Sequence, residues 1–153
     1  MRTARSIHPL PARRRLVARI SAALVLAAVL ACQPKPPEEE LLKTVEPVGS
    51  WIASLEMTGQ KWAANSVPTS FVRSITAAAR TQLETAGEEA ARSPARPAVR
   101  IPWQRLIAEA GSACAGLRQA VEVNDRGRLA REIGRLGALR ARFAALRKAG
   151  EGT

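Results

Sequence analysis

Few side chains of this 153-residue sequence are suited to catalysis. The only histidine is His8, close to the N-terminus, and the only aspartate is Asp125. The two cysteines, Cys32 and Cys114, are far apart in the chain. A Ser-His-Asp site, a Cys-His site and a histidine-based metal site therefore cannot be assembled from residues 32–153.

Paired glutamates are the remaining candidates for acid–base or metal chemistry. Those in the middle of the chain are Glu84, Glu88, Glu89, Glu109 and Glu122. Each lies off the apolar stripe of its predicted helix and has an arginine within helical reach, which is typical of solvated surface charge. We therefore expect a non-catalytic protein without metal or cofactor, and a carboxylate pair between two helices is the alternative.

Arginine side chains dominate the last predicted helix. Between residues 126 and 148 the sequence has eight basic residues and one acidic residue, Glu132. Four of the arginines recur at spacings of three, four and seven, which predicts one helical face: Arg128, Arg131, Arg135 and Arg142. We expect this face to bind anionic headgroups, lipopolysaccharide phosphates or an acidic envelope protein. In the alternative interpretation the face is only solvated, and Glu84, Glu88 and Glu89 partly neutralise it.

The N-terminal segment has the composition of an export signal. Residues 2–19 contain six arginines and no acidic residue, and an uncharged stretch of 12 residues follows from Ile20 to Ala31. At about 1.5 Å per residue this stretch reaches roughly 18 Å, short of the ~30 Å hydrocarbon core of a bilayer. The pattern predicts a cleaved signal peptide over residues 1–31 and not a permanent membrane span.

The apolar stretch ends in Val29-Leu30-Ala31-Cys32, and Gln33 follows. This sequence resembles the lipobox of bacterial lipoproteins, and the resemblance covers residues 1–32. It implies cleavage before Cys32, acylation of that cysteine with chains such as palmitate, and anchoring to a membrane of the bacterial cell envelope. By analogy with lipoproteins generally, Gln33 is compatible with the outer membrane of a Gram-negative cell, facing the periplasm. The alternatives are an ordinary cleaved signal, or a twin-arginine export signal around Arg13–Arg15.

Removal of the signal peptide changes the charge and the cysteine chemistry. The formal net charge of +11 falls to about +5, because residues 32–153 contain 18 basic and 13 acidic residues. Export also argues against nucleic acid as a partner. An acylated Cys32 cannot pair with Cys114, which we expect to be a small buried apolar residue. A reactive thiol or an intermolecular disulfide is the alternative for Cys114.

Residues 32–46 are predicted to be a lipidated, flexible tether. Three of residues 34–37 are proline, which favours an extended polyproline II chain at about 3.1 Å per residue. A helix that begins as early as Glu38 is the alternative, because the sequence EEELLK consists of good helix formers.

From Pro47 to residue 149, apolar residues recur at the three- and four-residue steps of α-helices. We expect Pro47 and Pro102 in the first turns of their helices. The breaks fall at Val67-Pro68, which is a turn or a kink, at residues 93–97, and at Asn124-Asp125, which also supplies the next N-cap. The stripe predicted for the helix over residues 68–92 comprises Phe71, Ile75, Ala78, Ala79, Gln82, Leu83 and Ala86.

These segments predict an all-α fold, a small up-down bundle of three to four helices over residues 47–149. We expect the aromatic residues to contribute most to its core: Trp51, Trp62, Phe71, Trp103 and Phe143. An exposed binding stripe is the alternative for Trp51 and Trp62. The alternative function is a carrier of a small apolar ligand, in a cavity lined by Trp51, Phe71, Leu106, Leu117 and Phe143. The oligomeric state is left open.

Overall fold

A computed structural model describes residues 36–151, which form four helices and contain no strand. The helices are α2 (Pro37–Ala63), α3 (Thr69–Arg92), α4 (Pro97–Glu122) and α5 (Arg126–Glu151). The described residues form one compact unit. The predicted all-α bundle is confirmed. The predicted signal peptide, Cys32 and tether residues up to 35 lie outside the described residues.

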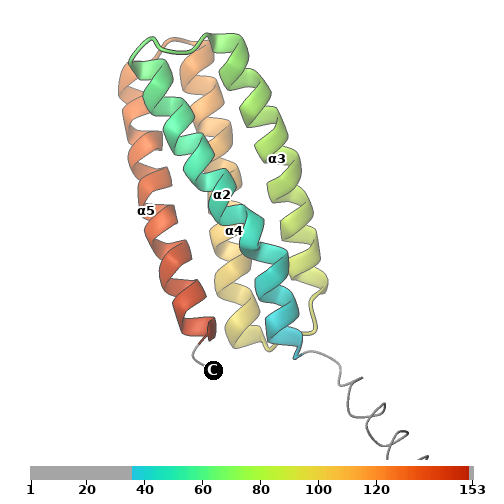
Figure 1. The fold of residues 1–153 in the computed structure, drawn as a ribbon. Coiled ribbons are helices and arrows are strands. Elements are labelled where there is room, and N and C mark those ends of the chain that lie inside the picture. The colour runs from blue at the N-terminus through green and yellow to red at the C-terminus, as the bar shows by residue number, and fades with distance from the viewer. Residues whose placement is uncertain (1–35, 152–153) are drawn as a thin grey trace, which may run out of the picture. The chain divides into compact units, whose positions relative to one another are not determined.

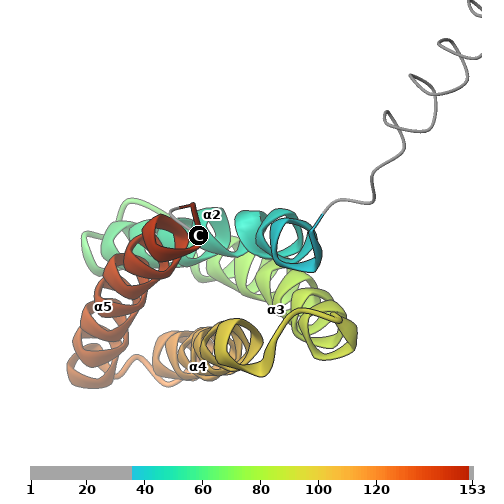
Figure 2. The ribbon, with the colours of Figure 1, turned by 90° about the horizontal axis from the view of Figure 1, so that it is seen from below.

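The four helices run alternately up and down, with short connections at both ends (Figure 1). Seen along the bundle, each helix lies at one corner (Figure 2). Helix α5 packs against α2 and α4 and makes no contact with α3, so α3 and α5 are diagonal neighbours. This arrangement decides which charged side chains can reach α5.

The prediction that residues 32–46 are a tether is wrong from residue 37 onward, because α2 begins at Pro37. Leu41 and Val45 are each only 1% exposed. They extend the buried face of α2, which also contains Val48 and Ile52, by two turns toward the N-terminus. Burial of such side chains contributes about 1.5–3 kcal/mol each, enough to offset the ~3 kcal/mol cost of a proline inside a helix. The bundle therefore starts earlier than residue 47.

Neither proline predicted to start a helix does so. Pro47 and Pro102 both lie inside helices, and the first-turn positions are occupied by Pro37 and Pro97. A proline in a helix interior removes one backbone hydrogen bond and is a common cause of bending. Figure 1 shows α2 changing direction where its colour passes from cyan to teal, in the stretch that contains Pro47.

The connections follow the predicted breaks. Val67-Pro68 belongs to a true turn between α2 and α3, and residues 93–96 separate α3 from α4. Asn65 and Asn124 both have a φ of 55°, a left-handed conformation that asparagine tolerates. Asp125 caps α5, since its Oδ1 accepts a hydrogen bond of 2.8 Å from the backbone N–H of Arg128.

The buried face of helix α3 is shifted from the predicted stripe, although Ala79, Leu83 and Ala86 are buried as predicted. Its buried residues are Val72, Thr76, Ala79, Leu83, Ala86 and Ala90. Phe71, Ala78 and Gln82 are exposed, so the predicted stripe is wrong at these positions. Thr76 is tolerated in the interior because its hydroxyl donates to the carbonyl oxygen of Val72 at 2.8 Å, one turn earlier.

Two aromatic rings meet in the core between α4 and α5. Trp103 is 2% exposed and lies edge-to-face with Phe143, with ring centroids 5.3 Å apart. The Phe143 ring packs directly on the backbone of Gly49 in α2. Trp51 and Trp62 are half-buried against the same core, as expected, whereas Phe71 is 43% exposed. Within the described residues, no helix combines the length and the apolar character that a membrane span requires.

Candidate functional site: the basic half of the bundle

Two arginines in the N-terminal part of α5, Arg128 and Arg131, have no acidic partner among the described residues. Among residues 36–151, no carboxylate lies within 4.0 Å of the guanidinium of Arg128 or Arg131. Arg131 is exposed and Arg128 is half-buried. Both lie within the first two turns of α5, next to the end of the bundle where α2 ends and α3 begins.

The other two arginines of the predicted face are engaged. Arg142 donates to Oε2 of Glu109 on α4 at 2.6 Å. Arg135 lies 3.8 Å from Oε2 of Glu132 and donates to the Ser112 hydroxyl at 3.4 Å. The predicted face is therefore divided. Arg128 and Arg131 have no acidic partner among the described residues, whereas Arg142 forms an ion pair that joins α5 to α4.

Arg126 has a structural role at the same end of the bundle. Its guanidinium donates to the backbone carbonyl of Ala63 at 3.2 Å and to Oδ1 of Asn65 at 3.1 Å. It also lies 6.0 Å from the ring centroid of Trp62, within the range of a cation–π contact. Arg126 thus ties the start of α5 to the end of α2, and it holds the turn that follows α2.

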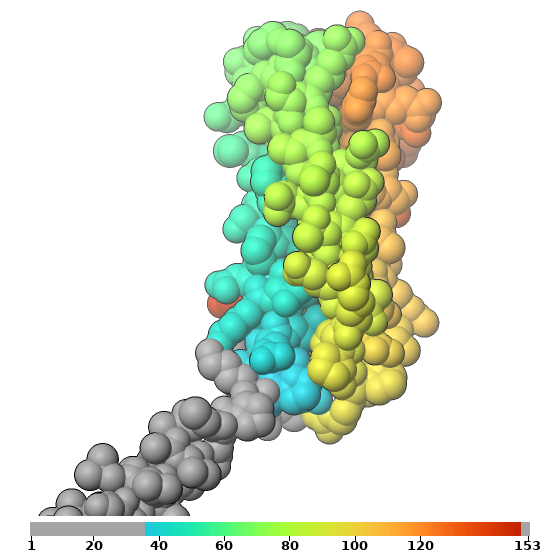
Figure 3. All heavy atoms as spheres, turned by 90° about the vertical axis from the view of Figure 1, so that its right-hand side faces the viewer, coloured from blue at the N-terminus to red at the C-terminus, as the bar shows by residue number. Residues whose placement is uncertain are grey.

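The glutamates expected to neutralise this face do not reach it. Glu84, Glu88 and Glu89 are exposed on α3, which does not contact α5. Glu84 and Glu88 pair with Arg80 and Arg92 of their own helix. Figure 3 views the face formed by α3, with α2 and α4 at its edges. The acidic partners of α5 come from its true neighbours, Glu56 on α2 and Glu109 on α4.

The net charge of the described bundle is concentrated in the half that lies away from Pro36. This half consists of residues 51–80 and 111–138, and it contains eight basic and four acidic side chains. The remaining residues between 36 and 151 contain nine of each. We call residues 51–80 and 111–138 the basic half. Because the other half is neutral, the basic half is the part of the domain that attracts anions at long range.

Exposed apolar side chains accompany the unpaired arginines in the basic half. Phe71, at the start of α3, is 43% exposed, and Val123, just after α4, is 63% exposed. Both belong to the end of the bundle at which α5 begins. Sequence periodicity places Phe71 in the core, so this exposed aromatic ring was not predicted.

The carboxylates do not converge on a common point. Within residues 36–151, no group of three or more His, Cys, Asp and Glu side chains is placed to hold a metal ion. Glu84, Glu88 and Glu122 are exposed and Glu109 is half-buried in its pair with Arg142. The interpretation of these residues as solvated surface charge is consistent with their positions.

Cys114 is buried and free, as expected. Its thiol donates to the backbone carbonyl of Thr76 at 3.4 Å. Burial raises the pKa of the Cys114 thiol to about 11, although Arg80 and Arg118 act in the opposite direction. The thiol is therefore protonated at neutral pH, and protonated thiols are poor nucleophiles.

The residues expected to line a ligand cavity do not do so. Leu106 and Leu117 are fully buried in the packed core, and Phe71 points outward enough to be exposed. An open apolar pocket lies instead at the end of the bundle where α2 begins, and none of the five residues predicted for the cavity lines it. Comparison of the chain with protein-family models, with curated proteins and with solved structures gives no match.

Proposed function

We propose that the chain is a cell-envelope lipoprotein, acylated at Cys32, whose bundle is a non-catalytic interaction module that binds an acidic partner. The anchor is supported by the resemblance of Val29-Leu30-Ala31-Cys32 to a lipobox. The interaction is supported by one observation above all: among residues 36–151 the excess positive charge lies entirely in the basic half, where Arg128 and Arg131 have no carboxylate partner. By analogy with lipoproteins generally, Gln33 after the acylated cysteine supports the outer membrane, facing the periplasm, as the proposed location.

The length of the chain before α2 favours an acidic protein over the headgroups beside the anchor. Cys32 precedes Pro36 by four residues, which span at most about 14 Å when fully extended. A helix of 26 residues such as α5 is about 39 Å long. An anchored bundle that stands upright on the membrane would therefore present its basic half to the periplasm. Arginine and aromatic side chains are enriched at protein-binding surfaces, and the basic half presents both, in Arg128, Arg131 and the exposed Phe71.

The anchor is tested by intact-mass analysis and labelled palmitate incorporation in the wild type and in Cys32→Ala. We expect a product cleaved before Cys32 that incorporates palmitate, and loss of the label in the variant. A cleaved product without acyl chains would contradict the anchor, and an uncleaved product would leave the apolar segment before Cys32 as the membrane attachment.

The interaction is tested with two double variants of residues 33–153 that lose the same charge. Arg128→Gln with Arg131→Gln removes the unpaired arginines, and Arg140→Gln with Arg142→Gln removes arginines that already pair with Glu56 and Glu109. We expect the first pair to abolish capture of an acidic protein from an envelope extract, and the second to preserve it. Equal loss in both would mean that only net charge matters. Loss of binding to anionic vesicles, with protein capture unchanged, would assign the arginines to headgroups.

A further inference from the structure

An apolar pocket opens at the end of the bundle opposite the start of α5. It has a volume of about 530 Å³, within the range of small-molecule binding sites. Three chain segments far apart in the sequence form it: the start of α2, the start of α4 and the end of α5. Because no single helix contains the site, its existence depends on the way in which the three helix ends meet.

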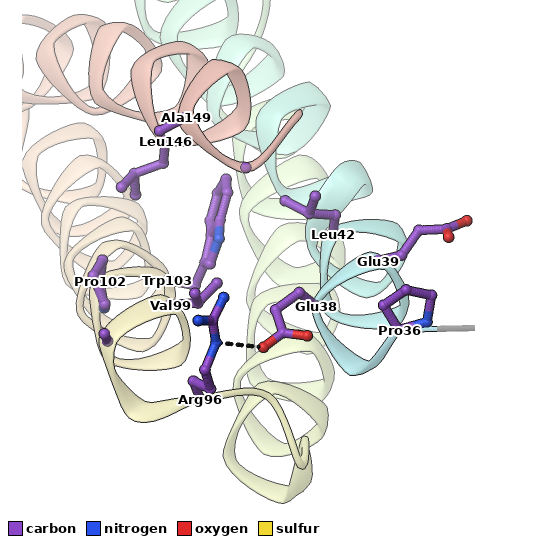
Figure 4. A pocket seen from close by; sticks show the side chains of 12 residues that line it. Pro36, Glu38, Glu39, Leu42, Arg96, Val99, Pro102, Trp103, Leu146 and Ala149 are labelled. Carbon is purple, nitrogen blue, oxygen red and sulfur yellow. Dashed lines mark hydrogen bonds and ion pairs between the residues drawn. The ribbon is translucent and has the colours of Figure 1, made fainter. Parts of the chain in front are cut away.

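The wall of the pocket is made of large apolar side chains. Figure 4 shows the Trp103 indole between Leu146 of α5 and Leu42 of α2, with Val99 at its base. Leu42, Val99 and Leu146 are only partly buried, so their surfaces toward the pocket remain open. Within residues 36–151, the indole N–H of Trp103 has no hydrogen-bond acceptor. An apolar wall with one free donor suits an aliphatic chain that ends in a carbonyl or carboxylate oxygen.

The charges at the mouth of the pocket are already balanced. Arg96 donates to Oε1 of Glu38 at 2.9 Å, and this ion pair lies below the Trp103 ring in Figure 4. Hydrogen bonds from the backbone amide of Glu38 and from Arg96 lower the pKa of the Glu38 carboxyl, so the carboxylate remains charged at neutral pH. Glu39 also lines the pocket and pairs with Lys43 at 2.8 Å, so the charges around the mouth are compensated and neither attract nor repel a charged headgroup strongly. Recognition must therefore depend on the apolar chain.

We propose that this pocket binds a single acyl chain of a membrane lipid, taken from the bilayer to which the chain is anchored. Pro36 lines the pocket, and residues 33–35 are all that separate it from Cys32. A tether of at most about 14 Å keeps Pro36 within that distance of the anchored cysteine, and therefore close to a bilayer in which acyl chains are at high local concentration. The source of the lipid rests on the proposed anchor at Cys32, whereas the affinity of the pocket for an acyl chain does not.

The test measures binding of cis-parinaric acid, a fluorescent fatty acid, to residues 33–153 without the anchor. This part contains the whole described core, which lies within one compact unit. We expect saturable binding that palmitate displaces. Leu146→Gln should weaken binding about tenfold, since it removes roughly 1.5 kcal/mol of apolar contact. Ala98→Trp should block the pocket, and Ala108→Trp, an exposed position of the same helix outside the pocket, is the matched control.

Each result decides for or against the pocket. Helical content from circular dichroism shows whether each variant is folded, and Ala98 is exposed, so its replacement leaves the core intact. Absence of binding by the folded wild type, or equal loss in Ala98→Trp and Ala108→Trp, would overturn the proposal. Binding by residues 33–153 but not by the acylated protein would identify the Cys32 acyl chain as the occupant, and it would overturn the bilayer as the source. Failure of Cys32 to be acylated is seen separately by intact mass.

Discussion

Replacement of Gly49 by alanine tests the tightest contact in the core. A Cβ atom at this position would lie 2.5, 2.8 and 2.9 Å from three ring atoms of Phe143. The ring has little freedom to move, because it also packs edge-to-face with the buried Trp103. Overpacking of this severity costs about 3 kcal/mol, at the upper end of the usual range. Alanine in place of glycine stabilises a helix by about 1 kcal/mol, so we expect the free energy of unfolding to fall by about 2 kcal/mol in total.

Gly134→Ala is the matched control, because a Cβ atom at Gly134 has no atom within 4 Å and the residue is exposed. We expect this variant to gain about 1 kcal/mol from helix propensity alone. Thermal unfolding of residues 33–153, followed by circular dichroism, should show a melting temperature about 8 °C lower for Gly49→Ala and about 4 °C higher for Gly134→Ala.

A second variant identifies the cause of the loss. Phe143→Leu removes the ring atoms that meet Gly49, so Gly49→Ala should cost less in its presence than in the wild type. If Gly49→Ala is as stable as Gly134→Ala, the Phe143 ring does not rest on the α2 backbone, and the reasoning about this contact is refuted. Additive effects of Gly49→Ala and Phe143→Leu would refute it equally.

Three further predictions concern the cap, the buried thiol and a surface ion pair. Asp125→Ala should lower the free energy of unfolding by about 1 kcal/mol, because it removes the side-chain cap of α5, and Asp125→Asn should restore most of the loss in urea unfolding. Because folding raises the pKa of Cys114 from 9.0 to about 11, the stability that this thiol contributes is present below pH 9 and is lost as the pH rises through 11. Urea unfolding between pH 8 and 11 should show a smaller decline in Cys114→Ala than in the wild type, and equal declines would contradict the shift. Arg142→Gln should change stability by no more than about 1 kcal/mol, because Arg142 and Glu109 are both partly exposed, and a larger loss would show that this pair is structural.

The buried residues of α2 show how far sequence periodicity can predict a helix. Leu41, Val45, Val48 and Ile52 recur at three- and four-residue steps, so the helix before Pro47 was visible in the sequence. Proline disfavours a helix interior, so the sequence predicts helix boundaries at Pro47 and Pro102. Whether it ends a helix depends on the burial available on both sides, and in α2 the buried Leu41 and Val45 supply it.

Helix α3 shows a second limit of predicting a buried face from sequence periodicity. Phe71 and Val72 are adjacent and both apolar, so either of two overlapping stripes satisfies the helical period. The structure buries Val72 and exposes Phe71, since the neighbours of α3 are α2 and α4 and they meet the face that contains Thr76 and Ala79. A buried threonine gives no apolar signal, because the hydrogen bond that satisfies its hydroxyl is formed only within the folded helix.

The sequence by itself determined the helical class, the basic character of residues 126–148 and the scarcity of catalytic side chains, because these depend on composition and on contacts within one helix. The resemblance to a lipobox likewise belongs to the sequence alone. Only the tertiary structure decided that Arg142 pairs with Glu109 while Arg128 and Arg131 stay unpaired, since ion pairs between helices depend on which helices are neighbours. The pocket beside Trp103 was decided in the same way, because three helix ends distant in the chain must meet before its walls exist.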